Sequence, residues 1–171
     1  MNITLEQLLA SRDARRVRQE ELRTQFPGRT LVCLTVMLPG AEKRNDLSLR
    51  IAAAGVAAFR SAFTPVFEER RDLETGYEAY FLVDAAAEAV KRRCCAIEEA
   101  HPIGRLFDMD VIGADGAPLS RTVVGAAPRK CLLCGRPARW CMRERSHSSA
   151  ELLACITRMT EAGLAKKSDN L

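Results

Sequence analysis

The sequence VFEERRDLETGYEAYFLV at residues 66–83 is the most informative stretch for the architecture. Residues 66–71 and 77–83 are two strand candidates, and the turn at Thr75-Gly76 between them predicts a β-hairpin. Helical patterns flank this hairpin on both sides. Helices that alternate with hairpin-linked strands predict an α+β fold with an antiparallel-rich sheet.

The segments on either side of the hairpin add a strand and two helices. Upstream, TLVCLTVML (30–38) is a continuous apolar run, as expected of a central strand, and a helical period begins at Asp46. Downstream, Asp84 can cap a second helix that ends near His101-Pro102.

A last strand is predicted in GRLFDMDVIGADG (104–116), which runs into a tight turn at Asp115-Gly116. LSRTVV (119–124) is expected to return as an extra hairpin strand. The resulting order is β-α-β-β-α-β, which predicts a ferredoxin-like or nucleotidyltransferase-like outline.

Further helices are expected at both ends of this core. Thr4 and Gln7 form a capping-box pattern for a helix over 4–24. We expect one domain over 1–171, made of an N-terminal helix (1–26), an α+β core (30–124), and a Cys-rich loop with a C-terminal helix (128–165).

The composition is that of an ordinary folded protein, with 171 residues, 47% hydrophobic and 28% charged. No apolar run approaches the roughly 18 residues of a membrane span, and MNITLEQLLASRDARR (1–16) has no apolar signal core. Seven cysteines without such a signal indicate reduced thiols or metal ligands. We therefore expect a cytoplasmic protein without a membrane partner.

The net charge of +4 is unevenly distributed, because basic residues crowd 12–23 and 121–145. This favours a polyanionic partner, whether a nucleotide, an acidic protein or nucleic acid. Aromatic residues make up only 5% of the chain, which counts against binding of single-stranded nucleic acid by base stacking.

Asp108 and Asp110 are the most informative polar residues. Strand side chains alternate between faces, so both carboxylates should lie on one face with their backbones about 7 Å apart. They can converge on a Mg²⁺ ion, which takes a few carboxylates and fills its other positions with substrate phosphates. The alternative is a solvated sheet face with two ordinary acids. The predicted faces are Leu106, Asp108, Asp110 and Ile112 on one side, and Phe107, Met109 and Val111 against a helix layer.

Gly104 and Arg105 precede this strand. A glycine lets the backbone approach a phosphate, and a guanidinium can brace a phosphate through two hydrogen bonds. Nucleotidyl transfer needs these parts together with a carboxylate-held metal.

A cluster with the spacing C-x₂-C-x₆-C-x₅-H is formed by Cys131, Cys134, Cys141 and His147. Three thiolates and an imidazole satisfy tetrahedral zinc, and a closed set of four would make the ion structural. The alternative is a basic loop with reduced cysteines, and a zinc-stabilised nucleic-acid-binding module is the rival function. The other cysteines, Cys33, Cys94, Cys95 and Cys155, are expected to be small core residues.

The chain resembles the apo-citrate lyase phosphoribosyl-dephospho-CoA transferase family over nearly its whole length. The motifs, in order, are SRDARRVRQ (11–19), LPGAEK (38–43), HPIGRLFDMDV (101–111), PRKCLLC (128–134) and CMRERSHSSAEL (141–152). The resemblance implies transfer of phosphoribosyl-dephospho-CoA from 2'-(5''-triphosphoribosyl)-3'-dephospho-CoA to a serine of the citrate lyase acyl carrier (gamma) subunit, with release of pyrophosphate. A related enzyme serves malonate decarboxylase, so the carrier of that complex is an alternative acceptor.

The resemblance implies that Asp108 and Asp110 hold Mg²⁺ and align the α-phosphate, and that Arg105 contacts phosphate. Because the nucleophile would be the partner's serine, no Ser-His-Asp arrangement is needed in this chain. The resemblance also implies that nucleic acid is not a partner. Asp84 and Asp115 are the candidates for a third carboxylate, and His101 is a loop residue or a base. The residues expected to bind substrate are Arg12, Arg15, Gln19, Lys43, Gly104, Arg121 and Arg129.

Overall fold

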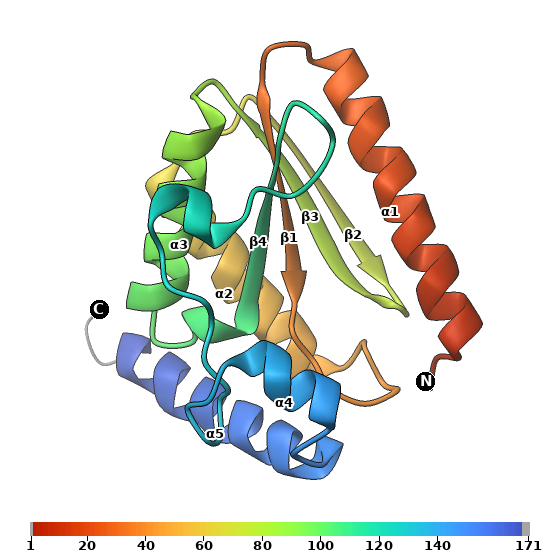
Figure 1. The fold of residues 1–171 in the computed structure, drawn as a ribbon, viewed down its shortest axis with the longest axis vertical. Helices are drawn as coiled ribbons and strands as arrows, with labels where there is room; N and C mark the ends of the chain where they lie inside the picture. The colour runs from red at the N-terminus through yellow and green to blue at the C-terminus, as the bar shows by residue number, and fades with distance from the viewer. Residues whose placement is uncertain (1, 169–171) are drawn as a thin grey trace.

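The computed structural model describes residues 2–168, which form five α-helices and a four-stranded sheet (Figure 1). The elements are α1 (Leu5–Gln25), β1 (Thr30–Val36), α2 (Asp46–Ala62), β2 (Phe67–Leu73), β3 (Gly76–Val83), α3 (Ala87–Ala100), β4 (Phe107–Ile112), α4 (Ala138–Glu144) and α5 (Ser149–Ser168). Short 3-10 helices occupy Gly104–Leu106 and Arg121–Val124.

The predicted α+β class and the β-α-β-β-α-β order are confirmed. The strand order in the sheet is β2-β3-β1-β4, and all three neighbouring pairs are antiparallel. The hairpin of β2 and β3 turns between Leu73 and Gly76, where the Gly76 φ of 126° suits glycine. The comparison with a ferredoxin-like or nucleotidyltransferase-like outline stays a prediction.

The predicted hairpin strand at 119–124 is wrong. Only a single bridge, between Ile112 and Pro118, follows β4, and the chain then forms the 3-10 helix Arg121–Val124. The amides of Gly113 and Leu119 make the two hydrogen bonds that flank this bridge, to the carbonyls of Ala117 and Val111. The pairing ends where the Ser120 side chain caps the 3-10 helix by accepting from the Thr122 amide.

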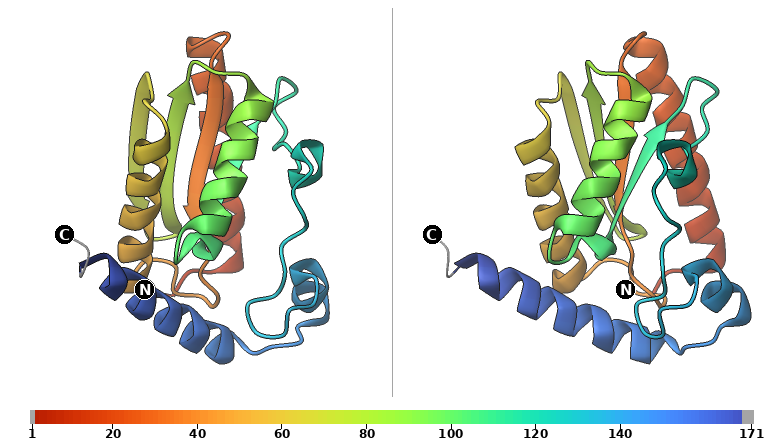
Figure 2. Two further views of the ribbon diagram at one scale, coloured as in Figure 1. Left: turned by 90° about the vertical axis from the view of Figure 1, so that its left-hand side faces the viewer. Right: turned by 60° about the vertical axis from the view of Figure 1, so that its left-hand side comes forward.

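The sheet separates two apolar layers (Figure 2). One face packs on α2 and α3, and the opposite face packs on α1 through Leu22. The α2-side layer includes Val32, Leu34, Phe59, Phe81, Phe107, Met109 and Val111. The α1-side layer includes Leu31, Cys33, Tyr80, Leu82 and Ile112.

The faces of β4 agree with the predicted alternation, with one exception. Leu106 belongs to the α2-side layer, so its predicted place beside the aspartates is wrong. The cause is the 3-10 helix at Gly104–Leu106, which ends the two-residue alternation before the strand begins.

β4 is an edge strand whose free backbone groups are satisfied from outside the sheet. An unpaired edge would otherwise invite pairing with another chain. The Met109 amide donates to Glu98, and Lys91 donates to the Met109 carbonyl. The Phe107 carbonyl accepts from Arg129, and the Val111 carbonyl accepts from the Leu119 amide. These contacts fix the strand that carries both aspartates.

The C-terminal segment lies across one end of the layers, where α5 runs past the end of α2 (Figure 1). Ile156 is buried in the α2-side layer, and a Cβ at Gly163 would lie 2.5 Å from Ile103, so α5 is closely packed there. Within residues 2–168, no helix combines the length and the apolarity needed to cross a membrane.

Candidate active site

Asp108 and Asp110 lie on the α1 side of β4, at the polar end of that face. Asp108 pairs across the ladder with Thr35, and Asp110 pairs with Cys33. Both aspartates are half-buried, whereas Ile112 farther along the strand is buried beneath α1. The carboxylates are therefore held on a rigid strand and still reach solvent.

The two carboxylates experience different surroundings. Burial, and then the charge of Asp108, raises the pKa of Asp110 to about 6, against the opposing effects of Lys91 and Arg129. Among the described residues, no hydrogen bond or ion pair is recorded for the Asp110 carboxylate, whereas an Asp108 oxygen lies 3.2 Å from Arg129 Nη2. Two carboxylates this close repel each other unless a cation lies beside them, so this pair fits a divalent metal.

Arg129 is positioned by a buried carboxylate that the sequence analysis did not single out. Glu98 of α3 is 2% exposed, and its Oε1 lies 2.7 Å from Arg129 Nη2. The other oxygen, Oε2, accepts from Arg121 Nη1 at 2.5 Å. Glu98 therefore holds both predicted cations at the edge of β4, next to Asp108. The sequence could have indicated that Glu98 is buried, because it follows Val90 and Cys94 at helical spacing on the inner face of α3.

Arg105 lies beside this network, and part of its guanidinium group has no hydrogen-bond partner among the described residues. Its Nη2 donates to the Lys130 carbonyl, and its Nε is buried without a hydrogen-bond partner among the described residues. Burial, followed by the charges of Arg129 and Arg121, lowers the pKa of Arg105. A side chain in this state favours an anionic ligand.

A partly open cavity of about 180 Å³ lies among these residues. Its cations outnumber the two glutamates that line it, so the cavity suits a phosphate-sized anion. The lining comprises Glu98, Glu99, Arg105, Arg121, Ala127, Pro128, Arg129 and Lys130.

Packing accounts for the glycine at Gly104. A Cβ there would lie 2.6 Å from the Glu98 carbonyl oxygen and 2.7 Å from that of Ile97. The Gly104 amide already donates to the His101 carbonyl at 2.8 Å. Glycine is therefore required at this position because the backbone passes close to the end of α3. The predicted approach of this backbone to a phosphate stays a prediction.

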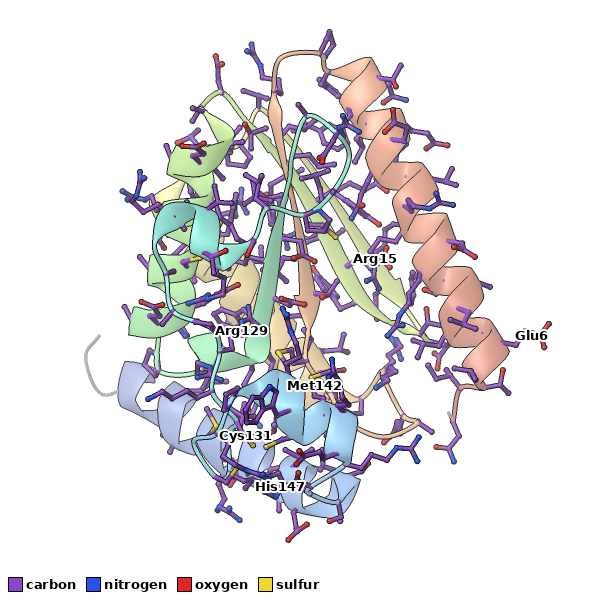
Figure 3. All side chains as sticks on the ribbon, viewed as in Figure 1. Glu6, Arg15, Arg129, Cys131, Met142 and His147 are labelled. Atoms are coloured by element: carbon purple, nitrogen blue, oxygen red, sulfur yellow. The ribbon has the colours of Figure 1, made fainter. Side chains whose placement is uncertain are left out.

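On the other side of the two aspartates, α1 contributes Arg15 and Gln19. Arg15 Nε donates to Glu78 Oε1 at 2.8 Å, and Gln19 hydrogen bonds with the buried Cys33. Glu78 is 1% exposed and also accepts from Tyr80 Oη at 2.5 Å. In Figure 3, Arg129 lies beside β4, whereas Arg15 lies toward α1.

Glu78 is a third carboxylate on this face, and the sequence analysis missed it. Glu78 of β3 pairs with Thr35 of β1, which in turn pairs with Asp108 of β4. Two strand spacings therefore separate Glu78 from Asp108, about 10 Å between backbones. The alternation of YEAYFLV could have identified it.

The predicted alternatives for a third carboxylate lie elsewhere. Asp84 forms an ion pair with Arg29 at 2.7 Å, and Asp115 accepts from the Ala117 amide in the turn after β4. A second hollow, of about 720 Å³, includes Asp115 and part of α1, and neither this hollow nor the 180 Å³ cavity is lined by Asp108 or Asp110. We take the aspartate pair as the candidate site because Arg129, which lines the smaller cavity, also contacts Asp108.

His101, Lys43 and Arg12 surround the ends of the strands. His101 accepts from the Ile103 amide and packs on the Phe107 ring, as expected of a loop histidine. Lys43 Nζ donates to the Leu38 carbonyl at 2.5 Å, and burial followed by the charge of Arg12 lowers the pKa of Lys43.

The four predicted metal ligands meet in space. The ligand atoms of Cys131, Cys134, Cys141 and His147 all lie within 4.8 Å of one another. Cys134 Sγ is 3.4 Å from Cys141 Sγ and 3.3 Å from His147 Nε2. Around tetrahedral zinc the expected separations are about 3.8 Å between two thiolates and about 3.6 Å between a thiolate and an imidazole nitrogen. Hydrogen bonding from Arg136 and then from His147 lowers the pKa of Cys134 to about 5, which favours the thiolate that binds metal.

The loop that carries the first two cysteines has the shape of a metal-binding turn. The Cys131 amide donates to the Arg136 carbonyl at 2.6 Å, and the Leu133 amide donates to Cys131 Sγ at 3.5 Å. Gly135 turns the chain with a φ of 70°. Cys141 of α4 and His147 then complete the set, and Figure 3 shows Cys131 and His147 at the end of the molecule where α4 and α5 lie.

Comparison with known proteins gives one consistent result. Residues 3–163 match the family model described as apo-citrate lyase phosphoribosyl-dephospho-CoA transferase. A Vibrio cholerae serotype O1 protein named probable apo-citrate lyase phosphoribosyl-dephospho-CoA transferase is 37% identical over 94% of this chain and 93% of its own length. A Streptococcus pyogenes serotype M18 protein with the same name is 32% identical over 92% of this chain and 85% of its own length. The Haemophilus influenzae protein CitXG is 37% identical over 93% of this chain, which spans only 35% of that longer protein.

Proposed function

Because the chain belongs to the apo-citrate lyase phosphoribosyl-dephospho-CoA transferase family, we propose that it attaches this prosthetic group to citrate lyase. The donor would be 2'-(5''-triphosphoribosyl)-3'-dephospho-CoA, and the acceptor a serine of the acyl carrier subunit. The observation that carries this proposal is the aspartate pair, with its raised pKa at Asp110, beside a cavity rich in arginine.

The reaction is a nucleotidyl-type transfer at the α-phosphate of the donor. The serine Oγ forms a new bond to the α-phosphorus, and the bond from that phosphorus to the bridging oxygen of the β-phosphate breaks. The electron pair leaves with pyrophosphate, and the serine proton passes to solvent. Asp108 and Asp110 would hold Mg²⁺, whose positive charge would offset the charge that develops on the attacked phosphate.

The basic cavity would bind the phosphate groups of the donor. Arg105 carries the unpartnered Nε, and Arg129 already bridges Glu98 and Asp108. Arg129 would orient Asp108, while Arg105 and Arg121 would contact the triphosphate or the departing pyrophosphate. Arg12, Arg15, Gln19 and Lys43 would border the donor on the α1 side.

The Cys131–His147 cluster would hold one structural zinc ion in the reduced conditions of the cytoplasm. Its four protein ligands leave no open coordination position, so this ion would not take part in transfer. The ion would stabilise the fold of residues 129–147 and so help to position Arg129.

A pyrophosphate-release assay tests the proposed function. Purified protein, the triphosphate donor and Mg²⁺ are incubated with the apo carrier subunit of citrate lyase, with that of malonate decarboxylase, or with no carrier. We expect rapid release only with the citrate lyase carrier. Equal or faster release with the malonate decarboxylase carrier would reassign the acceptor, and no release with either carrier would refute the transfer reaction.

A further inference from the structure

Large apolar side chains are exposed on and next to α4. Trp140 is 58% exposed and Met142 73% exposed, and Leu133 in the preceding loop is 37% exposed. Trp140 is the only tryptophan of the chain. Exposed aromatic and methionine side chains gathered on one short segment are typical of a surface that a partner protein covers.

The same segment is strongly basic. Residues 129–145 contain six arginine and lysine residues against one acid, Glu144. Glu144 pairs with Arg136 at 3.3 Å, and within residues 2–168 no ion pair is recorded for Arg139 or Arg143. On the helix, Arg139 and Arg143 are four residues apart and so lie on one exposed side, next to Met142.

This surface, the α4 patch (Leu133, Arg139, Trp140, Met142 and Arg143), is connected rigidly to the candidate active site. Cys141 is buried in the cysteine cluster, which fixes the inner side of α4. The Ala138 amide donates to the Arg129 carbonyl at 2.9 Å, so α4 begins directly against the residue whose side chain contacts Asp108. Figure 3 shows Met142 and Arg129 on the same side of the molecule.

We propose that the α4 patch is the docking surface for the acceptor carrier protein. The fitting partner surface is acidic, to pair with Arg139 and Arg143, and includes apolar side chains that cover Trp140 and Met142. Docking beside Arg129 would bring the acceptor serine to the aspartate pair. The inference rests on the proposed function, because it takes the acceptor of that reaction as the occupant.

Nucleic acid fits the patch less well than an acidic protein. A single exposed tryptophan offers one stacking platform, whereas strand binders stack successive bases on several rings. Asp108 and Asp110 would also repel a phosphate backbone that continued from the patch toward the sheet.

Steady-state kinetics with the full-length protein test the patch. We expect R139E/R143E to raise the KM for the apo carrier subunit about tenfold or more, with the KM for the triphosphate donor and kcat unchanged. M142S should raise the KM for the carrier without altering charge. The matched control is R50E/R92E, which makes the same change in net charge at exposed positions of α2 and α3.

The outcomes separate the two proposals. Absence of transfer by the wild-type protein would refute the proposed function, while transfer with equal KM values in R139E/R143E and the control would refute only the docking surface. If the variants unfold, the wild-type protein still gives a test, because its KM for the carrier must rise with salt while that for the donor rises less. Tight binding of a single-stranded DNA oligonucleotide that is lost in R139E/R143E, with no effect on the carrier, would overturn the assignment in favour of nucleic acid.

Discussion

Replacement of Asp110 by asparagine should stabilise the fold while it abolishes transfer. The folded protein raises the pKa of Asp110 from 3.8 to about 6, chiefly through burial and the charge of Asp108. An acid with a raised folded-state pKa favours folding while it is protonated, and that advantage is lost as the pH rises from about 4 through about 6. At pH 7.5 the ionised carboxylate therefore costs stability, and a neutral amide of the same shape should remove the cost.

The magnitude follows from the size of the shift. About two pKa units correspond to roughly 3 kcal/mol, at about 1.4 kcal/mol per unit. Because the carboxylate is half-buried and reaches some water, we expect a gain in the free energy of unfolding of about 1–3 kcal/mol for Asp110→Asn. At this chain length each kcal/mol raises Tm by roughly 2–4 °C.

Thermal and urea unfolding at pH 7.5 and pH 4, without added metal, measure this effect. The gain should be large at pH 7.5 and small at pH 4, where Asp110 is protonated in the folded wild-type protein. Asp115→Asn is the matched control, because Asp115 lies in the exposed turn after β4, and it should change stability little. A loss of stability in Asp110→Asn at pH 7.5, or wild-type transfer by this variant, would refute the reasoning.

Three further predictions concern pH, Arg105 and the cysteine cluster. The apparent affinity for Mg²⁺, measured by titration calorimetry, should fall about tenfold per pH unit below about pH 6 as a proton competes for Asp110, and a flat profile down to pH 5 would contradict metal binding there. Arg105→Ala should lower kcat/KM for the triphosphate donor about 10- to 100-fold, because a charge-assisted hydrogen bond to phosphate is lost; unchanged kinetics would make Arg105 a structural residue. Elemental analysis should find about one zinc per chain, and both chelation and Cys134→Ser should lower Tm, whereas little zinc and an unaltered Tm would leave ordinary reduced thiols.

The parts of the fold that follow from local rules were predictable from the sequence. Alternation along a strand placed Asp108 and Asp110 on the face opposite Phe107 and Met109, and the structure agrees. The rule failed at Leu106, where a 3-10 helix interrupts the alternation. It also failed after Leu119, where the Ser120 side chain caps a 3-10 helix and the chain leaves the sheet.

The contacts that build the site depend on tertiary packing, and here the sequence was less informative. The ligand spacing brought the cysteines and His147 to attention, and the fold gathers their ligand atoms. Glu98 and Glu78 look like ordinary helix and strand residues until the layers assemble, yet Glu98 holds Arg129 against Asp108, and Glu78 holds Arg15. Nothing local indicated that Arg105 would be directed to the Lys130 carbonyl, because that contact depends on how the loop before α4 returns to the sheet.

Intact mass spectrometry of the apo citrate lyase carrier subunit, after incubation with the protein, the triphosphate donor and Mg²⁺, tests the central claim most directly. We predict a mass increase of one phosphoribosyl-dephospho-CoA group on a single serine, matched by an equal amount of pyrophosphate, with the wild-type protein and not with Asp108→Asn or Asp110→Asn. An unmodified carrier, or a carrier modified equally well by the two aspartate variants, would contradict the account.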